Sequence, residues 1–143
     1  MKQTYVYDHY YKYQEITDIL NKYAAEHSDI ARLSSIGTTE QGRNIWLMEI
    51  TDLTTGDYSD KPALYIEGNI HAGEVTGCMT VMFLLDTIFT NCDTEEIKKI
   101  LAQYTIYAVP RVSPDGSEYF LTTEDTVRSV PKMYPYDTEM PGL

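Results

Sequence analysis

The spacing of apolar residues along the chain predicts a mixture of helices and strands. Tyr13, Ile16, Leu20 and Tyr23 recur at steps of three and four residues, which predicts an amphipathic helix ending near Glu26. A second segment, 75–89, is apolar almost all round, which is typical of a central, covered helix. Further elements are predicted as strands over 31–36, 44–51, 63–68 and 104–109, and as a helix over 94–103.

The order of these elements predicts an α/β fold. The first two strands are joined by a hairpin-like connection, and the middle of the chain reads strand, helix, helix, strand. We therefore expect a mixed β-sheet with helices on both faces. The strand at 63–68 is expected to be buried, and Asp93 to cap the helix that follows it, paired with Glu96. Residues 122–143 have no period and contain three prolines, which predicts an irregular tail.

Charge and length restrict the classes of partner. The 143 residues carry a net charge of -11, which argues against binding nucleic acid or an anionic membrane surface. No stretch of 18 apolar residues is present, so we expect no membrane span. The first residues contain no apolar signal region, and the compartment stays open. Cys78 and Cys92 would lie about 20 Å apart along a helix, too far for a disulfide.

His71 and Glu74 are the strongest candidates for chemistry. They follow the strand at 63–68, where ligand sites of open α/β sheets are found. Their spacing of three residues lets an imidazole nitrogen and a carboxylate converge on one ion, and zinc accepts that pair of donors. The alternative is that Glu74 only caps the following helix and His71 is a polar loop residue. The spacing alone leaves both readings open.

Two further segments carry candidate residues. Pro114-Asp115-Gly116 follows the last strand and, by itself, is best explained as a turn. Arg128 lies on a later loop of this acidic chain. It either pairs with a surface carboxylate or stands near a metal, where it would stabilise a developing oxyanion.

Three segments in order, 35–45, 68–74 and 113–116, together resemble the zinc carboxypeptidase family, the carboxypeptidase A-like metallopeptidases. The resemblance implies a zinc enzyme that hydrolyses the C-terminal bond of a peptide substrate. It implies that His71 and Glu74 are the first two zinc ligands and that Arg128 polarises the scissile carbonyl. Ser113 replaces the asparagine usual before Pro-Asp-Gly, and Gly73 replaces the arginine of pancreatic-type members.

The family's remaining site residues have no counterpart before Leu143. These are the third zinc ligand, the residues that grip the substrate's terminal carboxylate, the tyrosine that covers the substrate, and the general base. The resemblance therefore implies that residues 1–143 are the N-terminal part of one truncated catalytic domain, inactive alone. It also makes secretion or a periplasmic location an expectation, since the family is often exported.

Two non-enzymatic readings remain open at this point. The chain could be a truncated homologue that binds a partner or forms a homo-oligomer through an exposed sheet edge. It could also be an acidic domain without a site, in which case the three ordered segments are coincidental. A clean monomer in light scattering would count against the first reading, and absence of zinc binding, with no change in His71→Ala, would support the second.

Overall fold

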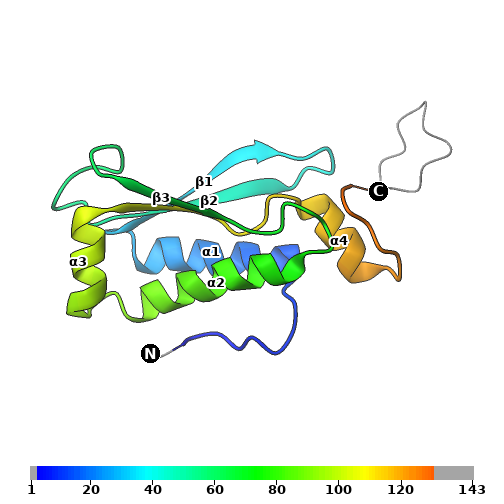
Figure 1. The fold of residues 1–143 in the computed structure, drawn as a ribbon, viewed down its shortest axis with the longest axis horizontal. Coiled ribbons are helices and arrows are strands. Elements are labelled where there is room, and N and C mark those ends of the chain that lie inside the picture. Colours follow the sequence, from blue (N-terminus) through cyan, green and yellow to red (C-terminus); the bar gives the residue numbers. More distant parts are fainter. Residues whose placement is uncertain (1–2, 131–143) are drawn as a thin grey trace.

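The computed structural model describes residues 3–130 (Figure 1). Its helices and strands closely follow the predicted order. They are α1 (Tyr13–Glu26), β1 (Ala31–Thr38), β2 (Asn44–Ile50), β3 (Ala63–Glu67), α2 (Val75–Thr90), α3 (Glu95–Gln103), β4 (Thr105–Val109) and α4 (Pro114–Thr122). Most of the predicted tail, 131–143, lies outside the described residues.

The four strands form one mixed sheet in the order β1-β2-β4-β3. β1 with β2 and β2 with β4 are antiparallel, whereas β3 and β4 are parallel, with Leu64 opposite Ile106 and Glu67 opposite Val109. The crossover between the parallel strands contains α2 and α3, as parallel pairing requires. The α/β class and the mixed sheet are thereby confirmed.

The two long helices α1 and α2 lie on the same face of the sheet (Figure 1). Between them and the sheet lies the core, in which Leu20 and Leu85 from the helices are buried with Met48 and Ile50 of β2. In Figure 1 no helix covers the opposite face of the sheet among residues 3–130. Part of that face is covered by the 51–62 loop, whose Tyr58 is buried.

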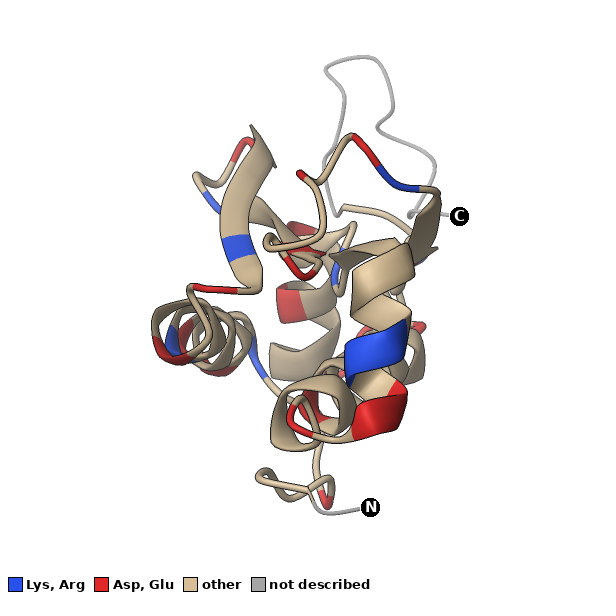
Figure 2. Ribbon diagram, turned by 90° about the vertical axis from the view of Figure 1, so that its left-hand side faces the viewer, with Lys and Arg blue, Asp and Glu red and all other residues tan. Residues whose placement is uncertain are grey.

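The N-terminal segment before α1, residues 3–12, is fixed by a buried carboxylate on α2. Asp86 is fully buried and accepts hydrogen bonds from the backbone amides of Thr4 and Tyr5 and from the Tyr23 hydroxyl. These bonds hold the segment before α1 against both long helices. At the end of the molecule seen in Figure 2, basic and acidic residues are interspersed.

Four predicted details are wrong in position or environment. β3 is an edge strand rather than a buried one, with Leu64 53% and Tyr65 57% exposed, because it pairs with β4 alone. β1 continues past Gly37 to Thr38 through a bulge instead of ending there. The cap of α3 is Thr94, whose hydroxyl accepts from the Ile97 amide. Pro114-Asp115-Gly116, predicted as a turn, forms the first turn of α4, which continues to Thr122, where the tail was expected to start. The proline suits this position because no amide hydrogen is needed in the first turn of a helix.

Cys78 and Cys92 are both free thiols, as the spacing predicted. Within residues 3–130 no single helix is long and apolar enough to cross a membrane. Only α2 and α3 taken together have that length and apolar character, and the two helices are bent by 110° relative to each other.

Candidate metal centre

Glycines place the loop that carries His71 tightly between β3 and α2. A Cβ added to Gly68 would lie 2.5 Å from the carbonyl oxygen of Gly77, in the first turn of α2. The end of β3 can therefore approach the start of α2 only because neither residue has a side chain. This contact fixes where the intervening residues 69–74 leave the sheet.

The side chains of His71 and Glu74 converge, which their spacing allows and the family resemblance implies. The Nδ1 atom of His71 lies 2.9 Å from Oε1 of Glu74. Their side chains are 35% and 61% exposed, so solvent and solutes reach both. Glu74 stands at the N-cap position of α2 but makes no side-chain capping hydrogen bond. Its carboxylate is directed to the imidazole, which disfavours the capping interpretation.

Arg128 reaches the same imidazole from the loop after α4. Its Nη2 lies 2.9 Å from Nε2 of His71, and its carbonyl oxygen accepts a hydrogen bond of 2.9 Å from the Ala72 amide. Because a guanidinium has only donors, Nε2 is the acceptor and the proton of the neutral ring sits on Nδ1, pointing to Glu74. The structure thus brings together all three site residues predicted from the sequence.

The donor set of this cluster fits zinc in chemistry but provides only two ligands. A tetrahedral zinc with bonds of 2.0–2.2 Å separates its ligand atoms by roughly 3.4 Å, so the two exposed side chains would move apart slightly. No group of three metal-ligating side chains exists within residues 3–130. The other histidines lie elsewhere: His9 contacts Asp8, and His27 contacts Cys92.

A buried ion pair joins the connection between β1 and β2 to Pro114-Asp115-Gly116. Asp115 is 2% exposed and accepts hydrogen bonds from the Thr39 hydroxyl, the Gln41 amide and Nη1 of Arg43. The β1–β2 hairpin is thereby fixed to the N-terminus of α4. Sequence reasoning missed this pairing, although both segments belonged to the resemblance.

α4 in turn packs against both loops of the candidate centre. A Cβ on Gly116 would lie 2.5 Å from the Ser129 carbonyl oxygen and 2.6 Å from Cβ of Ala72. Only glycine fits at this crossing, which explains the last residue of Pro-Asp-Gly. The hairpin, α4 and the two loops therefore form one connected support for His71 and Arg128.

The Glu74 side of the centre opens into a small hollow. It has a volume of about 240 Å³ and is lined by the loop at 67–70, Glu74 and Gly77. Glu67, at the end of β3, contributes a second carboxylate to this hollow. The centre is therefore accessible from the open edge of the sheet.

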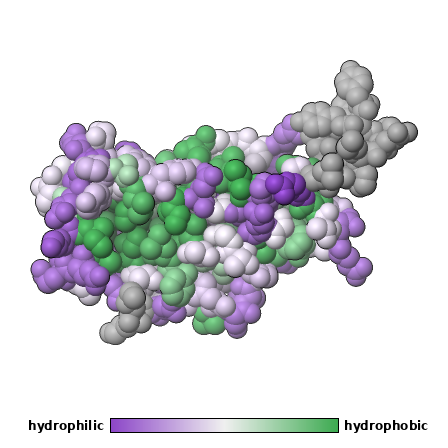
Figure 3. Space-filling model, in the orientation of Figure 1, coloured by the Kyte–Doolittle hydropathy of each residue, from purple (hydrophilic) through white to green (hydrophobic). Residues whose placement is uncertain are grey.

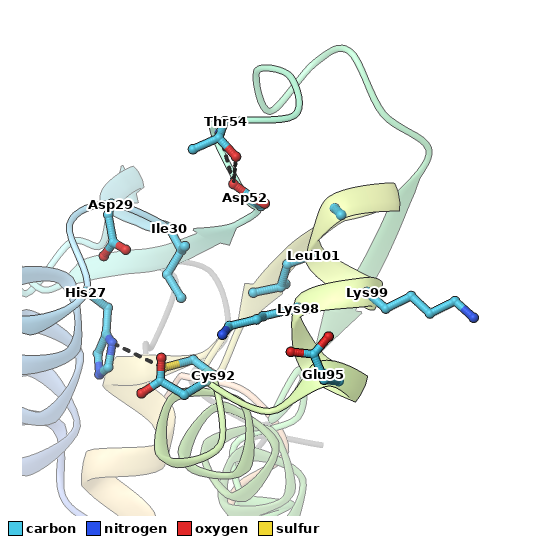
Figure 4. A pocket seen from close by; sticks show the side chains of 12 residues that line it. His27, Asp29, Ile30, Asp52, Thr54, Cys92, Glu95, Lys98, Lys99 and Leu101 are labelled. Atoms are coloured by element: carbon cyan, nitrogen blue, oxygen red, sulfur yellow. Dashed lines mark hydrogen bonds between the residues drawn. The ribbon is translucent and has the colours of Figure 1, made fainter.

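A larger cavity of about 680 Å³ lies at the other end of the sheet, near the start of β4 (Figure 4). In it, Nδ1 of His27 lies 3.7 Å from the Cys92 sulfur. Burial raises the pKa of the Cys92 thiol, and the carboxylates of Asp93 and Asp29 raise it further. The sulfur is therefore a protonated thiol at neutral pH, a poor nucleophile and a poor metal ligand.

Comparison with known proteins defines the class to which this fold and centre belong. The family model for zinc carboxypeptidases matches residues 16–135. The chain is 31% identical over 120 residues to a zinc carboxypeptidase of Saccharothrix mutabilis subsp. capreolus, covering 82% of this chain and 27% of that protein. It is 30% identical over 115 residues to carboxypeptidase B of Astacus astacus, covering 80% and 36%. The chain belongs to the zinc carboxypeptidase family and spans about a quarter to a third of the length of these relatives.

Solved structures support the same fold. Bovine thrombin-activatable fibrinolysis inhibitor, in complex with a tick carboxypeptidase inhibitor, superposes with a TM-score of 0.77 at 17% identity, covering 92% of this chain and 40% of that one. A carboxypeptidase A from Helicoverpa armigera gives a TM-score of 0.74 at 16% identity, covering 87% and 30%. The fold described above is therefore that of the matching part of these carboxypeptidases.

Proposed function

We propose that the intact protein is a zinc-dependent metallocarboxypeptidase that hydrolyses C-terminal peptide bonds. The observation that supports this most strongly is the convergence of His71 and Glu74, 2.9 Å apart, in a chain of this family. The inhibitor complex of the related bovine protein is consistent with a peptide or protein as substrate.

Each residue of the centre has a separate role in this proposal. His71 and Glu74 hold the metal. Because the Glu74 side chain is exposed, a metal bound there is accessible to substrate. When bound, zinc would polarise the scissile carbonyl and lower the pKa of water. Arg128 donates its guanidinium hydrogens to the carbonyl oxygen and stabilises the negative charge that develops there.

The proposal also requires residues that residues 3–130 do not provide. A third ligand and a general base must come from outside the described residues, since only two ligands converge there. We therefore expect the 143-residue chain alone, supplied with zinc, to release no C-terminal amino acid from a peptide. Turnover by the purified chain would contradict this expectation.

A chimera tests the proposed activity directly. Residues 16–135 would replace the aligned segment of the Saccharothrix zinc carboxypeptidase, which supplies the rest of the domain. We expect zinc-dependent release of C-terminal residues, abolished by Glu74→Gln and reduced by Arg128→Ala. A folded chimera whose activity is unaffected by Glu74→Gln would refute the assignment of Glu74.

As a second candidate, we propose a non-catalytic module that self-associates through β3. This strand is an unpaired edge with two large exposed side chains, Leu64 and Tyr65, and Figure 3 shows apolar surface between β3 and α2. The other edge, β1, carries a bulge and the exposed Arg32, features that hinder edge-to-edge pairing. Because β1 is protected and β3 is not, we expect β3 of one molecule to pair with β3 of a second copy.

Light scattering with two matched variants tests the second candidate. We expect a dimer at high concentration that becomes a monomer in Tyr65→Lys and persists in Ile36→Lys, which places the same charge at an exposed position on β1. A monomer at every concentration would rule out self-association through β3.

A further inference from the structure

Asn69 occupies the centre of the loop that carries His71, in an unusual conformation. It is 3% exposed, and its φ of 57° lies in the left-handed region. Among the described residues it is the only one other than glycine with a positive φ. Glycine would adopt this backbone without strain, so the conformation alone does not explain an asparagine here.

The side chain of Asn69 is fully engaged by polar partners. Its Nδ2 donates to the carbonyl oxygens of His71, at 2.7 Å, and Ala72, at 3.1 Å. Its Oδ1 lies 2.8 Å from the Ser117 hydroxyl, which shares its one hydrogen between this oxygen and the Ser113 carbonyl oxygen at 2.7 Å. Ser117 is fully buried on α4, so the amide ties the peptide groups of the His71 loop to a helix.

The same loop holds Arg128 in place through its backbone. The Ala72 amide donates to the Arg128 carbonyl, and the Asn69 carbonyl accepts from the Ser113 amide at 3.1 Å. A shift of the peptides at 71 and 72 would therefore displace both the imidazole and the guanidinium.

We propose that Asn69 is a positioning residue of the metal centre: its amide side chain fixes the backbone that aims His71 and Arg128 at the metal and substrate. This inference rests on the proposed zinc site. Hydrogen-bonding partners behind metal ligands typically change metal affinity by 10- to 100-fold when removed.

This role is tested by titrating the 143-residue chain with zinc and measuring the affinity from the NMR signals of the imidazole nitrogens. The chain has only three histidines, so His71 can be assigned with a His71→Ala variant. Asn69→Gly keeps the backbone conformation and removes the amide. We expect it to weaken zinc binding at His71 at least about tenfold. Ser117→Ala, which removes one partner of the amide, should weaken binding by a smaller factor.

Thr51→Ala is the matched control, because Thr51 is a fully buried polar residue at the other end of the sheet. Its hydroxyl hydrogen is shared between the carbonyl oxygens of Leu101, at 3.2 Å, and Tyr104, at 3.1 Å. It should lower the melting temperature without changing zinc affinity. Wild-type zinc affinity in Asn69→Gly, or an equal loss in Thr51→Ala, would overturn the positioning role while leaving the zinc site intact. Absence of zinc binding at His71 in the unaltered chain would overturn both. If Asn69→Gly does not fold, Ser117→Ala decides, and wild-type affinity there overturns the role.

Discussion

Removing Arg43 should cost far more stability than removing an ordinary surface cation. Asp115 is 2% exposed, and Arg43, with a side chain 26% exposed, is its charged partner at 2.8 Å. In Arg43→Ala the carboxylate keeps the Thr39 hydroxyl and the Gln41 amide but loses its counter-charge. Breaking a buried pair costs 3–5 kcal/mol, and the partial exposure of Arg43 places the expected loss near the lower limit, at about 3 kcal/mol.

Urea unfolding followed by circular dichroism measures this loss. The control is Lys22→Ala, which breaks an exposed pair with Glu26 on α1 and should cost about 0.5 kcal/mol or less. The slope of the unfolding free energy against urea concentration should be the same in both variants, so that a shift of the unfolding midpoint measures the change in stability. A loss below about 1 kcal/mol in Arg43→Ala would show that Asp115 does not depend on this arginine and that the hairpin is not fixed through it.

Three further results are expected. Gly116→Ala should destabilise the chain by about 1–3 kcal/mol, because its Cβ would meet a carbonyl oxygen at 2.5 Å; an unchanged melting temperature would contradict this. Burial raises the pKa of Asp86, but hydrogen bonds, first among them that from Tyr23, outweigh it and hold the pKa below its ordinary 3.8. The unfolding free energy should therefore fall as the pH drops below about 3.8 towards the folded-state pKa, a slope that Asp86→Asn should flatten in acid titrations. Zinc should displace Arg128 from His71, since a metal-bound neutral imidazole has no free acceptor; a guanidinium NMR signal unchanged at saturation would refute this.

Local sequence patterns predicted the elements well and their surroundings poorly. The three- and four-residue steps from Tyr13 to Tyr23 correctly placed α1 because one helix face packs on the sheet. β3 was judged buried because its residues are apolar, yet its position at the edge depends on the pairing order of the whole sheet. The turn residues of Pro114-Asp115-Gly116 concealed a helix, since proline in the first turn suits both structures.

The site residues could be predicted, but the structure that supports them could not. His71 and Glu74 are close in sequence, so their spacing allowed them to converge, and the family resemblance favoured convergence over helix capping. For Arg128 the residues left open a surface ion pair or a position near a metal, and only the family resemblance favoured the second, because a contact across 57 residues leaves no local pattern. The buried amide of Asn69 has no sequence signal, since asparagine in a loop is usually solvated.

The central claim, that His71 and Glu74 bind zinc, is tested most directly by adding zinc to the 143-residue chain and recording its imidazole resonances. The account predicts that the His71 ring nitrogens shift on binding, that His27 does not respond, and that Glu74→Gln weakens the effect at least about tenfold. A His71 ring that zinc leaves unchanged, or one that binds equally well without the Glu74 carboxylate, would contradict it.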